Sequence, residues 1–303
     1  MYLLRNLIAT FTIATAFFAA CSAHAELKYS GSDTLEPVLV AAQFSFLRGN
    51  PNFKMSVSHG GSSIGLRDLC SGKAALVGSS RPINASEAAL CAGAGVNATE
   101  LPVAYDPVAI VVSSKNTWLK DLTLAELSTV FSPASAGKIT SWKQVRATFP
   151  DVPIHAAGVG IKHATFDFFS KSLGLNGFIR SDYKDFKDHE STAKYVATDL
   201  GGIGFVSEAE ARTLEGQVQT IGIDFGKGIT RPSLEDVAAS KYDKLTRTVY
   251  LYVNAPMIAK SDALDIAFTK YLLKDMEQLV KFVNLTPLRT LQYQENSRRL
   301  TLQ

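Results

Sequence analysis

The chain has 303 residues, of which 46% are hydrophobic and 19% charged, with 21 glycines and 11 prolines. This composition is typical of a globular protein and excludes a disordered, collagen-like or low-complexity chain. The net charge of +3 at pH 7, with no run of basic residues, excludes a dedicated nucleic-acid binder, whose affinity depends on clustered cations.

Residues 1–25 have the pattern of a secretory signal peptide. Arg5 precedes an uncharged apolar run from 7 to 20, and Ala23-His24-Ala25 forms an A-x-A exit. The run is too short to span a bilayer comfortably, and no later run approaches that length. We therefore expect an exported, periplasmic protein in an oxidising compartment. The alternative is a lipid anchor at Cys21, because residues 18–21 weakly resemble a lipobox.

Strand-like and helix-like patterns alternate along the rest of the chain. Short apolar or alternating runs predict strands at 27–29, 55–58, 74–77 and 108–112. Helical spacing follows from Leu35 to Phe46, a capping box at 123–126 opens another helix, and a long amphipathic pattern covers 264–283. This alternation predicts an α/β fold with layers around mixed, mostly parallel sheets.

Three turns rich in glycine and serine follow the first three predicted strands. They read SGSDT (30–34), HGGSSIG (59–65) and GSSRP (78–82). Each lies between a strand end and a helix start, so in a parallel sheet all three meet at the carboxyl edge, where ligands of open α/β folds bind. Asp33 and Glu36 also have capping-box spacing, with Pro37 in the first helical turn.

These turns predict a site for a small oxyanion. Helix N-termini offer free N–H groups, the turns add hydroxyl donors, and Arg81 adds a positive charge. The alternative is that the turns only cap helices, since Ser, Asp and Gly are the residues that caps prefer. A third interpretation is a serine hydrolase, because GSSIG (61–65) fits the G-x-S-x-G pattern with Ser63 as nucleophile. The triad order then needs a histidine after an acid, and the last histidine is His189.

Two cysteines remain after the signal, Cys70 and Cys91. In an exported protein this number predicts a disulfide, with two buried free thiols as the alternative. The five histidines have no ligand spacing near these cysteines, so we expect no metal and no cofactor.

Eight sequence blocks in order resemble the phosphate-binding substrate-binding proteins of bacterial ABC importers. The blocks are SGSDTL (30–35), GGSS (60–63), SSRPI (79–83), YDPVA (105–109), LTLAEL (122–127), GKITSW (137–142), GGIGF (201–205) and YLYVN (250–254). Each is weak alone, and together they cover essentially the whole chain after the signal. The resemblance implies a non-enzymatic receptor that captures inorganic phosphate by lobe closure and presents it to a membrane ABC permease. Another oxyanion or a small carboxylate is the alternative ligand.

The resemblance also implies a two-lobed periplasmic binding protein of type II, monomeric, with the ligand cleft between its lobes. Lobe 1 would comprise 26–107 plus 250–303, and lobe 2 would comprise 108–249, with crossing strands near 103–112 and 247–254. The implied first-lobe ligands and their neighbours are Ser32, Asp33, Thr34, the Leu35 amide, Ser62, Ser63 and Arg81.

The second-lobe loop departs from the family pattern, which has an Arg followed by Ser-Gly-Thr at a helix start. Here Thr165 is retained, Val159 stands in place of the Arg, and His163 in place of the Ser. Lys162 and His163 are the candidate replacement cations, or else belong to a solvated helix start with no ligand role. Asp33 is the candidate acceptor for the proton of hydrogen phosphate, which sulfate lacks, with helix N-cap as its alternative role.

Overall fold

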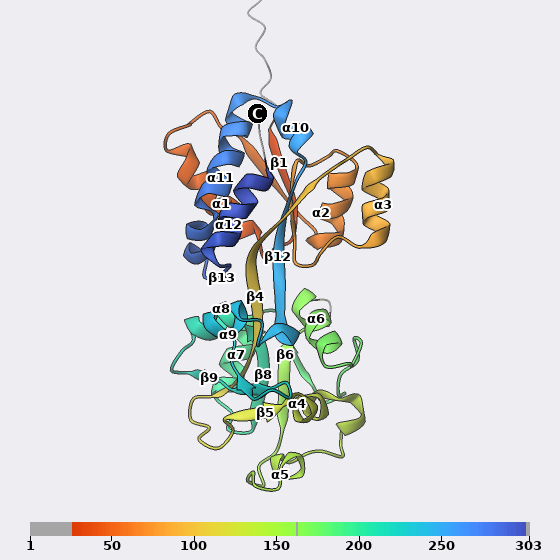
Figure 1. Cartoon of the computed structure of the whole chain (residues 1–303). Helices are drawn as coiled ribbons and strands as arrows, with labels where there is room; N and C mark the ends of the chain where they lie inside the picture. Colours follow the sequence, from red (N-terminus) through yellow and green to blue (C-terminus); the bar gives the residue numbers. More distant parts are fainter. Residues whose placement is uncertain (1–25, 162, 301–303) are drawn as a thin grey trace, which may run out of the picture.

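The structure is a computed structural model that describes residues 26–161 and 163–300. The predicted signal peptide, with Cys21, and the candidate cation Lys162 lie outside these residues. Figure 1 shows two halves, one above the other, with strands β4 (Thr99–Ser113) and β12 (Thr246–Val253) running between them. No helix in the described ranges is both long and apolar enough to cross a membrane.

The upper half is built from the beginning and the end of the chain. Its sheet has the order β2-β1-β3-β12-β4, with β1 parallel to both of its neighbours. Its other elements are β1 (Leu27–Gly31), α1 (Glu36–Leu47), β2 (Met55–His59), α2 (Gly61–Cys70), β3 (Leu76–Ser79), α3 (Ala85–Gly93), α10 (Ala255–Ala259), α11 (Ala263–Phe282), β13 (Thr286–Pro287) and α12 (Thr290–Arg299).

The lower half is built from the middle of the chain. Its main strands follow β4 in the order β8-β6-β7, and β5, β10 and β11 form a small separate sheet. Its elements are β5 (Asp121–Thr123), α4 (Leu124–Phe131), α5 (Trp142–Val145), β6 (His155–Val159), α6 (Ala164–Ser172), β7 (Lys184–Phe186), α7 (His189–Ala197), β8 (Gly202–Ser207), α8 (Glu208–Thr213), β9 (Val218–Thr220), β10 (Gly222–Asp224), β11 (Ile229–Thr230) and α9 (Leu234–Ala238), with 3-10 turns at Pro133–Ser135 and Asp243–Leu245.

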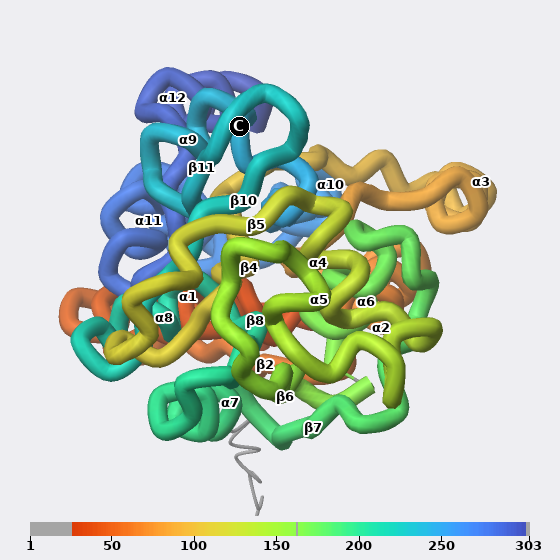
Figure 2. Tube along the Cα trace, turned by 90° about the horizontal axis from the view of Figure 1, so that it is seen from below, coloured from red at the N-terminus to blue at the C-terminus, as the bar shows by residue number. Residues whose placement is uncertain are grey.

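Each half has its own hydrophobic core. In the upper half α1 buries the apolar face that the sequence predicts against α11, and Phe46 and Phe53 pack on Phe268. In the lower half a separate cluster surrounds Phe205, with Phe169 stacked on it. Figures 1 and 2 place α1, α11 and α12 on one flank and α2 and α3 on the other. The exact lobe borders at 107/108 and 249/250 stay a prediction.

The two crossing strands exchange partners where they pass between the halves. β4 pairs with β12 as far as Pro107, in antiparallel register, and pairs with β8 from Val108 onward. β12 has a register shift between Val249 and Tyr250, which is typical of a β-bulge. The halves therefore share two strands, and the residues nearest this exchange can contact both.

Local signals in the sequence are mostly confirmed. Thr123 and Glu126 form the predicted capping box of α4, and Cys70 and Cys91 form the predicted disulfide between α2 and α3. The strand expected at 74–77 instead begins at Leu76. The capping box expected from Asp33 and Glu36 is wrong, because α1 begins at Glu36 and its N-cap is Leu35, whose side chain has no polar atom to accept a hydrogen bond.

Candidate functional site

Four hydroxyl-bearing residues from the three Gly/Ser turns meet at the carboxyl edge of β1, β2 and β3. The Oγ atoms of Ser32 and Ser80 lie 2.5 Å apart, and Ser80 Oγ donates to Thr34 Oγ1 at 3.4 Å. The backbone N–H of Ser80 donates to Ser62 Oγ at 2.9 Å. The predicted convergence of the three turns is therefore present in the structure, and we call these four residues the hydroxyl cluster.

Ser80 is a member that sequence reasoning did not select, although it stands in the predicted turn. In a sequence, a charged residue such as Arg81 is a stronger indicator of an anion site than a neighbouring serine. The hydrogen-bond partners show that Ser80 links all three turns, since it bonds to Ser32, Thr34 and Ser62.

Close backbone approach holds the cluster in place. Gly31 has a φ of 122°, and a Cβ there would lie 2.2 Å from the carbonyl oxygen of Gly78. The N–H of Ser32 donates to that same oxygen at 2.9 Å, and the Tyr29 hydroxyl donates to the carbonyl of Ser32 at 2.9 Å. Glycine is required at position 31 because any side chain would push β1 away from β3.

The predicted Leu35 amide already has a partner. Its N–H donates to the Ser32 carbonyl at 3.2 Å, and the residue is fully buried at the start of α1. Its role as an anion ligand stays a prediction.

Arg81 is fixed by a carboxylate beside the cluster. Its Nη1 and Nη2 donate to the two oxygens of Glu87 at 2.8 and 2.7 Å, and Nη2 also donates to Ser63 Oγ at 2.9 Å. The bond with Arg81 lowers the pKa of Glu87, so the guanidinium charge is balanced by an ionised neighbour. The Ser63 hydroxyl thus contacts a guanidinium, which cannot serve as the general base that a nucleophilic serine needs.

The second-half residues named by the sequence gather at the start of α6. His163 is the N-cap, and its Nδ1 accepts from the N–H of Thr165 at 3.1 Å. The Thr165 side chain is buried, with Oγ1 3.5 Å from Nε2 of His189 on α7. The two imidazole rings lie 4.9 Å apart. Val159 is fully buried in the lower core, so it offers the site no polar group.

A buried ion pair that sequence reasoning missed lies beside Thr165. Arg247 and Asp106 are register partners on β12 and β4, and Nη2 of Arg247 donates to Oδ2 of Asp106. The same Nη2 donates to Thr165 Oγ1 at 3.2 Å. Both residues stood in predicted crossing strands. Their pairing was not visible because opposite charges become a signal only when the strand register is known.

Electrostatics keep both histidines neutral at pH 7. Burial, followed by the charge of Arg247, lowers the pKa of His163, although Asp106 and Asp33 oppose this. Burial, His163 and Arg247 lower the pKa of His189 to about 3. The shift of His163 is opposite to what a replacement cation requires.

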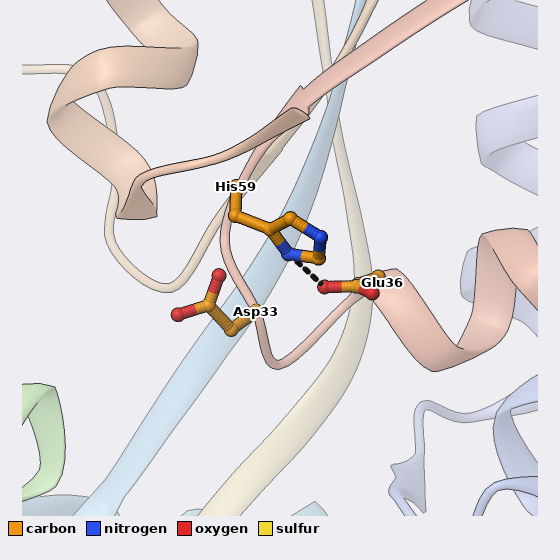
Figure 3. Close-up of side chains that lie close together, drawn as sticks. All are labelled: Asp33, Glu36 and His59. Carbon is orange, nitrogen blue, oxygen red and sulfur yellow. Dashed lines mark ion pairs between the residues drawn. The ribbon is translucent and has the colours of Figure 1, made fainter. Parts of the chain in front are cut away.

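Asp33 lies close to Glu36 and His59, as Figure 3 shows. His59 Nδ1 lies 2.8 Å from a carboxylate oxygen of Glu36, and the ligand atoms of all three side chains lie within 4.8 Å of one another. They are mostly exposed, and such groups are common on protein surfaces without a metal. The N-cap alternative for Asp33 is wrong, because α1 has no side-chain cap. The charge of Asp33 opposes the lowering of the pKa of His163 at the start of α6.

Known proteins resemble the chain over most of its length. The Synechocystis protein SphX is 36% identical over 236 residues, which are 78% of this chain and 70% of the relative. The Staphylococcus epidermidis phosphate-binding protein PstS is 26% identical, over 83% of this chain and 75% of its own.

Solved structures share the fold. A possible phosphate-binding protein from Planctomyces limnophilus matches with a TM-score of 0.74 and 26% identity, over 91% of this chain and 98% of its own. An ABC-type phosphate transport receptor from Vibrio cholerae matches with a TM-score of 0.67 and 21% identity, over 86% and 98%, and shows the fold alone. A model described as a PBP superfamily domain matches residues 19–275. The chain therefore belongs to the PBP superfamily of two-lobed binding proteins.

Proposed function

We propose that the chain is an extracytoplasmic receptor that captures inorganic phosphate between its two halves and delivers it to a membrane ABC permease. The relatives named phosphate-binding proteins support this ligand, and the predicted signal peptide supports the location. In this proposal the protein binds its ligand without chemical change and needs no cofactor.

The hydroxyl cluster carries the proposal. Ser32, Thr34, Ser62 and Ser80 can turn their O–H groups toward an anion, because a hydroxyl hydrogen rotates freely about its C–O bond. Exchange of their mutual hydrogen bonds for bonds to a charged oxygen is favourable, since charge-assisted bonds are the stronger kind. In this proposal, closure of the halves brings Thr165, at the start of α6, onto the anion from the other side.

Asp33 fits the selection of phosphate against sulfate. It is exposed beside the cluster, and a carboxylate accepts the proton of hydrogen phosphate but repels an oxyanion that has no proton to give. The exclusion of sulfate by this residue is part of the proposal.

Isothermal titration of refolded, ligand-free protein with phosphate, sulfate, molybdate and acetate tests the ligand. We expect saturable heat with phosphate and at least 100-fold weaker binding of sulfate.

Ser80→Ala removes the hydroxyl that links the three turns and should weaken phosphate binding roughly 10-fold or more. Ser45→Ala, on the exposed side of α1, is the matched control and should leave the affinity unchanged. Saturable heat with acetate or molybdate instead of phosphate would overturn the assignment of the ligand.

The same preparation tests the absence of hydrolase chemistry. A fluorophosphonate probe reacts with an activated serine, whereas Ser63 contacts the guanidinium of Arg81. We expect no labelling at Ser63 by mass spectrometry. Stable labelling that Ser63→Ala abolishes would make the chain a hydrolase.

A further inference from the structure

We propose that Arg247 is an anion-binding residue and supplies the positive charge that the second-half loop lacks at Val159. This inference rests on the proposed function, because it concerns the same phosphate site. Asp106 acts through Arg247 as a positioning residue. The charge would thus have moved from the loop before α6 to the strand that crosses between the halves.

Among the described residues of the loop before α6 none is a cation, and Lys162, which the sequence places there, lies outside them. Val159 is buried in the core, and His163 uses Nδ1 as an acceptor, which requires that this nitrogen carry no proton. Thr165, in the first turn of α6, matches the family pattern, and its Oγ1 accepts a hydrogen bond from Arg247. A cation therefore stands next to the retained ligand position, although it comes from another element.

The guanidinium of Arg247 has donor capacity left for a ligand. The residue is 8% exposed, and its Nη2 bonds to both Asp106 and Thr165. Its Nε is buried and has no hydrogen-bond partner among the described residues. A buried N–H without an acceptor is costly, and on a guanidinium it is the group best suited to receive an oxyanion. A bound phosphate oxygen would satisfy it.

The position of Arg247 fits a ligand shared by both halves. It lies on β12 next to Thr246, the register partner of Pro107, where β4 exchanges β12 for β8. Nη2 of Arg247 contacts Thr165 at the start of α6, and the strand that carries Arg247 continues into the upper half, where residues 250–253 pair with β3. Asp106 balances the charge of the guanidinium, whose Nη2 also contacts Thr165.

An ion pair that only stabilises the fold would have the same geometry as one that also binds phosphate. The stability of each variant and its phosphate affinity are therefore measured separately. Loss of one partner leaves the other charge buried and unpaired, which destabilises the fold by itself. The double variant Arg247→Gln/Asp106→Asn removes both charges and keeps side chains of similar size. Thermal unfolding without phosphate shows whether each variant is folded.

Titration with inorganic phosphate at fixed pH and ionic strength then tests the role. We expect the folded double variant to bind at least 100-fold more weakly than the wild type, and Arg247→Lys to bind at least 10-fold more weakly, because lysine keeps the charge without the planar fork. Arg146→Gln removes the arginine that pairs with Glu126 and Asp121, and should bind normally. Arg146 is the C-cap of α5, which Figure 1 shows at the end of the lower half, away from α6.

Wild-type affinity in the folded double variant would overturn the role of Arg247 and leave the proposed function intact. Failure of the wild type itself to bind phosphate would instead overturn the proposed function. For Asp106 as a positioning residue, Asp106→Glu should recover affinity that Asp106→Asn loses, whereas equal affinity of these two variants would contradict that role.

Discussion

His189 is a buried imidazole, and its burial lowers its pKa. Its ring contacts His163 and Thr165, and its Nδ1 is buried without a partner among the described residues. A positive charge there would lack solvent and would face Arg247. His189 therefore remains neutral, and the positive charge next to Thr165 comes from Arg247 alone among these two residues.

The lowered pKa of His189 predicts a loss of stability in acid. Between its ordinary pKa of 6.5 and about 3, the unfolded chain binds a proton that the folded chain does not. The free energy of unfolding should therefore fall as the pH drops through this range, by up to about 1.4 kcal/mol per pH unit from this group. Urea unfolding in phosphate-free buffers at pH 7.5 and 5 measures it.

The control for this prediction compares two histidine variants. His189→Gln should show a weaker dependence on pH between 7.5 and 5 than the wild type. His59→Gln, on the exposed surface, should retain the wild-type dependence. Equal slopes for the wild type and His189→Gln would assign the acid sensitivity to other groups.

At single positions, sequence reasoning found local chemistry and missed chemistry that depends on register. Ser32 and Ser62 could be selected because a turn between strand and helix is a local pattern. Arg247 and Asp106 are far apart in the chain and lie in strands, where a charged residue usually faces solvent. Their contact exists only because β4 and β12 pair in one register. Glu87, which balances Arg81, belongs to a capping box that was likewise not foreseen.

At the scale of elements, the approach of β1 to β3 sets the geometry of the hydroxyl cluster. Gly31→Ala should destabilise the protein by about 2–3 kcal/mol, because its Cβ would meet the Gly78 carbonyl and its φ is unfavourable for a side chain. Phosphate affinity should fall as well, since the Ser32–Ser80 contact would widen. Thermal unfolding and calorimetric titration measure the two effects.

Gly49→Ala is the matched control, because a Cβ at that position meets nothing within 4 Å. It should change stability by less than about 0.5 kcal/mol. If Gly31→Ala behaved like Gly49→Ala, the close approach would not be what holds the cluster.

The disulfide fastens α3 to α2 behind the binding turns. Closure of a loop of 21 positions contributes on the order of 3 kcal/mol in the chain-entropy model. The variant Cys70→Ser/Cys91→Ser should therefore unfold at a temperature lower by several degrees, with phosphate affinity within about twofold of the wild type. A loss of binding in a variant that is still folded would show that the disulfide shapes the site.

At the scale of the whole molecule, two shared strands permit the halves to approach each other. Closure on phosphate should reduce the radius of gyration measured by small-angle X-ray scattering, because mass moves toward the centre. The folded double variant Arg247→Gln/Asp106→Asn should show no decrease at the same phosphate concentration. An unchanged radius in a phosphate-saturated wild type would contradict closure. The same scattering data give the molecular mass and so test the expected monomer.

The α/β architecture was accessible from sequence because its signals are periodic and local. The apolar face of α1, the amphipathic pattern of α11 and the capping box at Thr123 are each read from one continuous stretch of sequence. The short strands β9, β10 and β11 have no such pattern, since two or three residues are too few to show alternation. The antiparallel pairing of β4 and β12 depends on contacts between distant segments.

The core of the upper half joins the two ends of the chain, and this has a consequence for the order of folding. Phe46 and Phe53 near the beginning pack on Phe268 near the end, whereas the residues around Phe205 all come from the middle. In synthesis from the N-terminus, residues 108–245 can complete the core of the lower half while residues 27–104 still lack their apolar partners from the end of the chain. Those residues, which contain the hydroxyl cluster, complete their core only after α11 has followed.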